Sequence, residues 1–519
     1  MAMLAAGRYS QLESVRYDVL ERARDAAKLT IPALMPPSGH NQTSKLATPY
    51  QGIGARGVNN LASKLLLALL PPNSPFFRMI VDDFTLEKMT QRPGMRAEVE
   101  KALNKYERAI MTKIEVLAIR VSIFEALKHL INDGNVLLHV TKEGVRVFRL
   151  DQYVVVRDPT GNVIEIIVKE SVSPMVLPEQ IRKAVTDKDP DGADVMKNVD
   201  VYTHIKRNPT QWTIYQEVKG LKIPGSIGQY PLKKSPWIPL RWTKIDGEDY
   251  GRGYIEEYLG DLRSLEALTQ AIVEGSAAAA KVLFLVNPNG TTQMKQIAEA
   301  PTGALRPGRA EDVSVLQLEK YNDFRVAFQT IEMIQQRLSF AFMLNAAVQR
   351  NGERVTAEEI RFMAGELEDA LGGVYSILSQ ELQYPLVVTL IHMMERSGDL
   401  PSLPRELVRP TITTGLEALG RGHDLNRLQL MLQQIAPLGP EVIQQHLNVS
   451  DYIARVGTSL GIDMDGLIRT PEELQAAQQQ MMMQQMMDKL GPKGMDIVRD
   501  QMKPGTENGP QASQAAGPQ

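Results

Sequence analysis

Apolar residues recur at helical spacing through the first quarter of the chain. The segment Ser10–Glu13 has the S-x-x-E form of a capping box, so the pattern predicts a helix from there to about Leu29. Two further helices are predicted, around 59–70 and over 96–131. The first quarter is therefore expected to be mostly helical.

From about Gly134 the pattern changes to short runs rich in β-branched residues, which turn residues separate. Asp158–Asn162 has the composition of a hairpin turn. A charged loop is expected at 187–194. Strands are predicted at 136–140, 145–150, 153–157, 163–169, 199–206, 212–218 and 238–244. These runs predict an antiparallel sheet.

Helical spacing returns after this block. Apolar residues from Ile255 to Ile272 fall on one face of a predicted helix that ends near Lys281, and those from Phe324 to Phe342 on one face of a second. Between them lie β-like runs at 282–286 and 313–316. The pattern predicts two long helices that flank a small β insert.

A capping box at Thr356–Glu359 opens a predicted long helix that reaches about Arg396. Gly372-Gly373 and Pro385 fall inside it, so kinks are expected there. Shorter helical segments follow Pro401.

A last helix is predicted from Thr470–Glu473, where proline occupies the first helical position. Residues 475–487 then hold six Gln and five Met. Two interpretations stay open: a low-complexity tract, or a soft apolar face made by Met481, Met482 and Met486. The tail after Gly491 is expected to be flexible.

Composition allows a sizeable core, because the 519 residues are 43% hydrophobic and 23% charged. The fold class expected is α+β, mostly helical. The net charge of -3 argues against a tight general DNA binder but allows DNA as a passenger. No signal peptide or membrane segment is expected, since the most apolar run, Leu61–Leu70, contains Lys64 and is too short.

Motifs for catalysis are weak or absent. The chain has no cysteine, no P-loop and no HExxH. Gly52–Gly57 matches GxGxxG but follows a polar loop where the nucleotide fingerprint needs a strand. Gly457–Gly461 matches GxSxG, yet no histidine follows His446. We expect no catalytic residue, cofactor or metal.

The polar segment from Gln349 to Arg354 lies between two predicted helices. It has two interpretations: a solvent loop, or a loop that faces DNA, where guanidinium groups touch phosphates without reading bases. The candidate DNA-contacting residues are Gln349, Arg350, Asn351 and Arg354.

Several segments together resemble the portal, or head-to-tail connector, proteins of short-tailed bacteriophages that carry their own RNA polymerase. The resemblance covers roughly residues 10–465, in order, and thins at 175–235, at 287–310 and beyond 470. The segments that carry it are Thr48–Leu65, Phe124–Leu130, Tyr250–Glu266, Leu338–Asn345, Gly352–Ile360, Leu371–Leu382 and Thr414–Gly422.

The resemblance implies a portal fold with a wing of helices and antiparallel sheet, a two-helix stem, a small β-containing clip, a helical crown and a C-terminal barrel and tail. The implied parts are the N-terminal wing (1–253), stem helix 1 (254–281), the clip (282–318), stem helix 2 (319–343), the tunnel loop with the kinked wing helix (344–397), the crown (398–470), and the C-terminal helix and tail (471–519).

It also implies a function: a non-enzymatic ring of twelve copies through which double-stranded DNA passes without sequence specificity during packaging and ejection. The implied partners are the terminase, the scaffold and major capsid proteins, a tail adaptor and internal core proteins. Assembly is expected in the host cytoplasm, and the final location is the virion.

Two alternatives remain. Another ring-forming virion connector or adaptor is one, although adaptors are usually small helical bundles without a long sheet. A nuclease or NTPase is the other, and no motif in the chain supports it.

Overall fold

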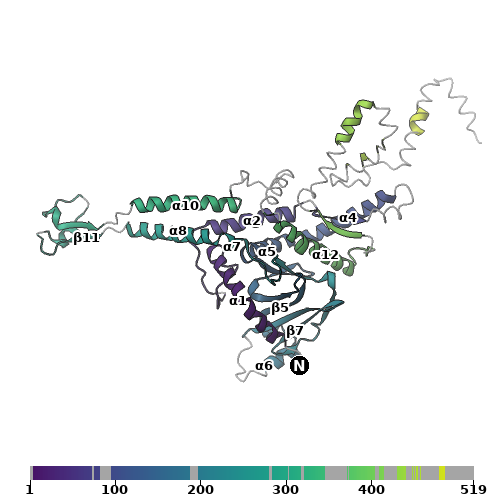
Figure 1. The fold of residues 1–519 in the computed structure, drawn as a ribbon, viewed down its shortest axis with the longest axis horizontal. Coiled ribbons are helices and arrows are strands. Elements are labelled where there is room, and N and C mark those ends of the chain that lie inside the picture. Colours follow the sequence, from purple (N-terminus) through teal and green to yellow (C-terminus); the bar gives the residue numbers. More distant parts are fainter. Residues whose placement is uncertain are drawn as a thin grey trace, which may run out of the picture. The chain divides into compact units, whose positions relative to one another are not determined.

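The structure is a computed structural model, and the chain divides into two units, Met1–Ala418 and Leu419–Gln519. Figure 1 shows the fold. The residues that the structure describes are 4–41, 43–72, 75–81, 95–186, 197–279, 283–290, 292–301, 303–316, 321–344, 371, 373–403, 408–413, 429–439, 447, 449, 452–453, 456 and 479–484.

The first part of unit 1 is helical, as predicted, with α1 (Ala5–Leu29), α2 (Ile53–Leu69), α4 (Met95–Val116) and α5 (Ile119–Asp133). The predicted start of α1 at the Ser10 capping box is wrong. The helix begins at Ala5, whose backbone N–H donates to the buried carboxylate of Glu217 at 3.1 Å. A group distant in sequence therefore supplies the cap, so no local motif marks the start.

The single helix expected over 96–131 is two helices. The chain breaks at Ala118, whose φ of 48° is left-handed, and α5 begins at the next residue. The break reorients the chain, so that α5 packs against α2 as well as α4. A left-handed alanine carries a steric cost and leaves no signal in the apolar pattern.

Two antiparallel sheets follow. One has the order β10-β2-β3 and the other β4-β5-β6-β7-β8, with β9 also paired to β7. The bounds are β2 (Asn135–Val140), β3 (Val145–Phe148), β4 (Tyr153–Arg157), β5 (Val163–Val172), β6 (Val199–Arg207), β7 (Gln211–Val218), β8 (Leu221–Lys222), β9 (Gly228–Pro231) and β10 (Trp237–Arg241). The seven predicted strands are confirmed with shifted ends; β8, β9 and the helix α6 (Glu179–Thr186) were not predicted.

The predicted turn between β4 and β5 is confirmed. Asp158 N–H bonds the carbonyl of Asn162 at 2.8 Å, and the Asp158 carboxylate accepts from Thr160 and Asn162. The side-chain hydrogen bonds from Thr160 and Asn162 lower the pKa of Asp158 to about 2. The Asp158 carboxylate in the turn thus stays ionised across most of the acid range. The loop expected at 187–194 lies outside the described residues.

The predicted helix pair and β insert are also present. The elements are α7 (Tyr254–Glu257), α8 (Leu259–Ala279), β11 (Leu283–Val286), α9 (Met294–Ala298), β12 (Val313–Leu316) and α10 (Tyr321–Ala341). Figure 1 shows α8 and α10 side by side, and β11 pairs with β12 antiparallel. The helix expected from Ile255 is interrupted at Tyr258, between α7 and α8.

One pairing joins distant parts of the chain and was not predicted. β1 (Phe77–Val81) pairs antiparallel with β13 (Val408–Ile412). Before β13 comes α12 (Tyr384–Ser397), and a π-helical turn, η5 (Ser379–Gln383), precedes it. The irregularity expected at Pro385 is therefore a π-turn just before the proline; the predicted start at Thr356–Glu359 lies outside the described residues.

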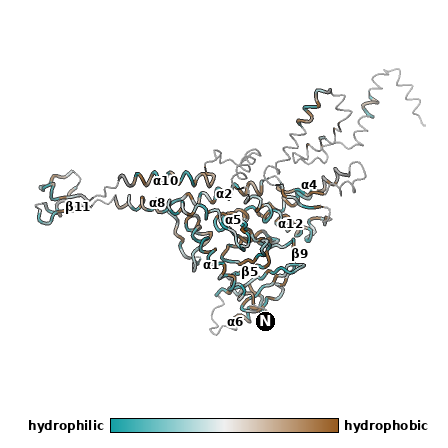
Figure 2. The backbone as a smooth tube through the Cα atoms, in the orientation of Figure 1, coloured by the Kyte–Doolittle hydropathy of each residue, from teal (hydrophilic) through white to brown (hydrophobic). Residues whose placement is uncertain are grey.

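The largest apolar core joins α2, α5, α8, α10 and α12, and a second core lies between α1 and the sheets. The brown stretches in Figure 2 follow these elements. In unit 2 the described residues are short helical pieces; Gln479–Gln484 is one, with Met481 and Met482 exposed. No helix among the described residues is long and apolar enough to cross a membrane.

Candidate functional site

The predicted DNA-contacting residues Gln349, Arg350, Asn351 and Arg354 lie outside the described residues. The structure describes the chain up to Leu344, describes Leu371, and resumes at Gly373. The two flanks show how the segment that carries these four residues is held.

The flank that leads into the segment is anchored on α2. Phe342 is fully buried, and the Asn60 amide donates to the carbonyls of Phe342 and Met343 at 2.9 and 3.2 Å. The Lys64 ammonium donates to the Met343 carbonyl at 3.1 Å, and the Tyr254 hydroxyl to the Ala341 carbonyl at 2.9 Å. These donors satisfy carbonyls that a helix end leaves open, so the end of α10 is tied to the core.

The flank that leaves the segment is anchored on the same helix. The Tyr375 hydroxyl donates to the Ala68 carbonyl at 2.9 Å, and the buried Gln383 amide donates to the Leu69 carbonyl at 2.7 Å. Both carbonyls belong to the last turn of α2, so side chains from a distant segment cap α2 at its C-terminus.

The π-turn η5 ties this second flank to the sheet. Its Glu381 carboxylate forms an ion pair of 2.6 Å with Arg241, at the end of β10 and only 2% exposed. Burial lowers the pKa of the neighbouring Arg157 to about 10, although the Glu381 charge acts to raise it. Arg157 is held in turn by the Pro239 and Asp249 carbonyls.

Both anchors therefore lie on α2. Asn60 and Ala68 are eight positions apart in one helix, which corresponds to about 12 Å along its axis. The segment that carries the candidate arginines leaves from and returns to one rigid element.

The GxGxxG segment is part of α2 itself. Gly54 and Gly57 lie inside the helix, and residues 45–49 before it form no strand, so the strand that a nucleotide fingerprint needs is missing there. A side chain on Gly54 would overlap the Leu29 carbonyl, and one on Gly57 would overlap the Phe342 ring. The glycines let α1 and the end of α10 approach α2 closely.

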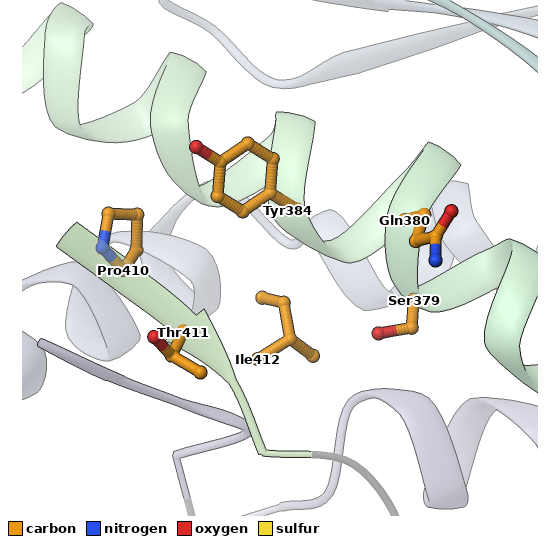
Figure 3. Close-up of a pocket in the computed structure, with 6 residues that line it drawn as sticks. All are labelled: Ser379, Gln380, Tyr384, Pro410, Thr411 and Ile412. Atoms are coloured by element: carbon orange, nitrogen blue, oxygen red, sulfur yellow. The ribbon is translucent and has the colours of Figure 1, made fainter. Parts of the chain in front are cut away.

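A pocket of about 300 Å³ opens between η5 and β13. Figure 3 shows its lining: Ser379, Gln380, Tyr384, Pro410, Thr411 and Ile412. None of the six side chains is a carboxylate, imidazole, amine or guanidinium. The pocket can accept an apolar group between the tyrosine ring and Ile412, but it has no acid–base pair for catalysis.

One cluster has the outline of a nucleophile relay. The Tyr215 hydroxyl lies 2.8 Å from His204 Nδ1, and His204 Nε2 lies 2.7 Å from the Glu165 carboxylate. Burial, and then the nearby carboxylates, raise the pKa of Tyr215, which is the opposite of what an activated nucleophile requires. Arg8 also binds Glu165, at 3.0 Å, so the cluster ties α1 to the sheet.

Among the described residues no group of three His, Asp or Glu side chains could hold a metal ion. The GxSxG match at Gly457–Gly461 lies outside them. Asn60, Lys64 and Glu381 could not be identified from the sequence, because each acts through a contact with a segment far along the chain. No local signal marks them.

A family model described as bacteriophage head to tail connecting protein matches residues 2–468. The chain belongs to this family, and so to a class of structural protein that connects the phage head to its tail.

Individual relatives of the chain agree with this family assignment. The chain is 46% identical over 489 residues to the portal protein of Escherichia phage T7, covering 92% of this chain and 91% of that one. It is 46% identical over 483 residues to the portal protein of Enterobacteria phage T3, covering 92% and 90%. For the portal protein of Enterobacteria phage SP6 the identity is 31% over 513 residues, with 96% of each chain covered.

Solved structures match more weakly. A chain in the virion of a native gene transfer agent particle has a TM-score of 0.35 at 14% identity, covering 79% of this chain and 90% of that one. A chain in the neck of an empty particle of the same kind has a TM-score of 0.36 at 12% identity, covering 78% and 89%. Scores this low carry no argument about the assembly.

Proposed function

We propose that identical copies of this chain form a ring at one vertex of a phage capsid, and that double-stranded DNA passes through the ring during packaging and ejection. The observation that carries the proposal is the pair of long antiparallel helices, α8 and α10, with the small β insert between them. Such a hairpin, repeated around an axis, lines a passage with helices and presents its insert at one end.

The proposed parts of the ring are those that the resemblance implies. Helices α8 and α10 support the stem, at 254–281 and 319–343, and strands β11 and β12 support the clip, at 282–318. The N-terminal part of the wing comprises 1–253, the tunnel loop and the kinked wing helix 344–397, the crown 398–470, and the C-terminal helix and tail 471–519.

The tunnel loop, with Gln349, Arg350, Asn351 and Arg354, contacts DNA phosphates without reading bases. The anchors of both flanks on α2 support this role, because a loop that resists sliding DNA needs rigid ends. The near balance of charge supports a weak grip, since each phosphate contact adds salt-dependent affinity.

The role is structural rather than enzymatic. The terminase hydrolyses ATP and docks on the ring, which provides a closed passage. Scaffold and major capsid proteins join the ring during head assembly in the host cytoplasm, where the ring nucleates the shell; internal core proteins and a tail adaptor bind it in the virion. A dodecamer is the expected ring.

Electron microscopy of the purified full chain, with classification that imposes no symmetry, tests the ring. Rings with a central channel and about twelve-fold symmetry are the expected result. A persistent monomer or dimer would contradict the proposal, and a small solid ring without a channel would favour an adaptor role.

Replacing Arg350 and Arg354 with Ala tests the tunnel loop. The double variant should form rings as the parent does, because neither residue belongs to an anchor, yet heads packed with it should lose DNA faster after packaging. Retained DNA per particle is the measurement. Unchanged packaging and retention would contradict the loop's contact with DNA.

A further inference from the structure

Strand β13 forms one edge of a two-stranded ribbon with β1. The N–H of Thr413, just after the strand, donates to the Phe76 carbonyl at 3.0 Å, and this bond sets the alternation of the ladder. The backbone groups of Arg409 and Thr411 therefore face β1. The backbone groups of the residues that alternate with them face away from β1.

The outward-facing backbone groups of β13 belong to Val408, Pro410 and Ile412. Proline suits such a position because it has no N–H to leave unpaired. Among the described residues no group hydrogen-bonds the N–H of Val408 or Ile412. The opposite edge of the ribbon is covered, since the Met79 N–H of β1 donates to the Glu107 carboxylate at 2.8 Å. The ribbon is thus closed at β1 and open at β13.

The pocket of about 300 Å³ lies against this open strand. Its walls come from η5, the start of α12 and β13, and none of its lining residues belongs to β1. Figure 3 shows Tyr384 and Ile412 on two sides of the pocket, and Tyr384 is 40% exposed. An open strand beside a pocket suits an extended peptide, because the peptide backbone pairs with the strand and alternate side chains enter the pocket.

The other face of the ribbon is exposed and positively charged. Register pairs Arg78 with Thr411 and Ile80 with Arg409, so the two arginines lie diagonally on the same face. Arg409 is exposed, and in the part of the chain that the structure describes neither guanidinium has a carboxylate partner. A strand added to β13 would place every second side chain beside Arg409.

We propose that an extended acidic segment of another protein adds to β13 as a third strand of this ribbon. Its backbone pairs with the open edge, and every second side chain is apolar, so that one of them enters the pocket beside Ile412. The side chains between them are acidic and lie next to Arg409 and Arg78. One chain makes the whole site, so the inference goes beyond the proposed ring and does not depend on it.

Charge and shape favour this occupant over two others. A second copy of β13 would bring further arginines to the same face, and like charges opposite one another destabilise a sheet. Duplex DNA could meet the arginines, but its phosphates would leave the apolar pocket empty and the strand's outward carbonyls unpaired. An acidic strand uses the open edge, the pocket and the positive charge together.

Peptide binding to the purified full chain tests the site. The probe is a labelled peptide that alternates valine with glutamate, and its counterpart alternates valine with lysine. Fluorescence anisotropy gives the Kd of each. We expect the acidic peptide to bind about tenfold more tightly, the effect of one or two exposed ion pairs, and this preference should shrink in high salt.

A charge reversal on the ribbon shows whether the peptide binds there. Arg409→Glu should remove the preference for the acidic peptide. Arg396→Glu is the matched control, because Arg396 is also exposed but lies in the last turn of α12, at the far end of that helix from the pocket. It should keep the preference of the parent protein. If Arg409→Glu fails to fold, Arg78→Glu tests the same face.

Hydrogen exchange resolved to single amides tests the strand pairing. In the free protein the Ile412 amide should exchange as an unprotected one, whereas the Thr411 amide, which is bonded to β1, should be protected. The acidic peptide should protect the Ile412 amide and leave the exchange of Thr411 unchanged.

Several results would overturn the inference. An Ile412 amide already protected in the free protein would mean that the chain itself or a second copy covers the edge. Equal binding of the two peptides, binding of neither, or a preference that Arg409→Glu leaves intact would exclude the acidic strand. Displacement of the acidic peptide by duplex DNA would assign the arginines to phosphate. Electron microscopy of the same preparation decides the proposed ring separately.

Discussion

The body formed by α1 and the six-stranded sheet differs from the α8–α10 hairpin in where its side chains find partners. In the body the fully buried Arg16 donates to the carbonyls of Leu150 and Tyr153. On the hairpin, large apolar side chains such as Phe340 stay exposed. The body thus holds a buried charged side chain through contacts within one chain, whereas the hairpin leaves apolar side chains without cover.

The largest difference in unfolding free energy is expected between truncations of a buried and an exposed aromatic ring at the end of α10. Phe342 is fully buried against Tyr254 and Tyr258, so Phe342→Ala should lower the free energy of unfolding by about 3–5 kcal/mol. Phe340, 82% exposed and two residues away, is the matched control: Phe340→Ala should change it by less than about 0.5 kcal/mol in the monomer.

Chemical denaturation of monomeric protein measures both values, and ring yield is followed in parallel. Phe340→Ala should reduce ring yield while leaving the monomer's unfolding unchanged. Equal losses of monomer stability in the two variants would remove the distinction between buried and exposed side chains at the end of α10.

The second-largest effect is expected on the stability of the body at acid pH. The hydrogen bond to His204, followed by that to Arg8, lowers the pKa of Glu165 below its usual 4.5. The stability this gives is fully present above pH 4.5 and is lost as pH falls through the lower folded-state pKa. Glu165→Gln should therefore make the melting temperature fall less steeply as pH is lowered below 4.5. A fall as steep as that of the parent protein would count against this role of Glu165.

The smallest effect is expected at the hairpin's own ion pair. Arg337 is 64% exposed and Asp261 31%, so solvent screens their attraction. Arg337→Ala should cost at most about 1 kcal/mol of unfolding free energy, and less in high salt. A loss of several kcal/mol would mean that this pair, rather than apolar packing, holds the two helices together.

The sequence pattern predicted the elements whose burial has a simple period. The apolar face of α8 was readable because it packs on one continuous surface, and β5 was readable from its run of β-branched residues. The ends of elements were not readable: α1 starts early through Glu217, and a left-handed alanine separates α4 from α5. Such contacts join residues far apart in sequence.

The same limit applies to the candidate site. Arg350 and Arg354 were chosen from composition and resemblance, and they stay a prediction. Their support on α2 could not be predicted, because Asn60 and Lys64 look like ordinary surface residues of an amphipathic helix. The exposed apolar residues of α10 could have been predicted, because the seven-residue spacing of Val326, Met333 and Phe340 is visible in the sequence.

The attachment of both flanks to α2 also bears on how the tunnel loop can evolve. Because its ends are set by one helix, the entropy of closing the loop depends only weakly on the number of residues, by about 0.6 kcal/mol per doubling of length. Insertions and deletions in the tunnel loop, 345–355, should therefore cost little stability, while changes at Asn60 or Gln383 should cost more. The loop can thus change in length while its supports stay constant.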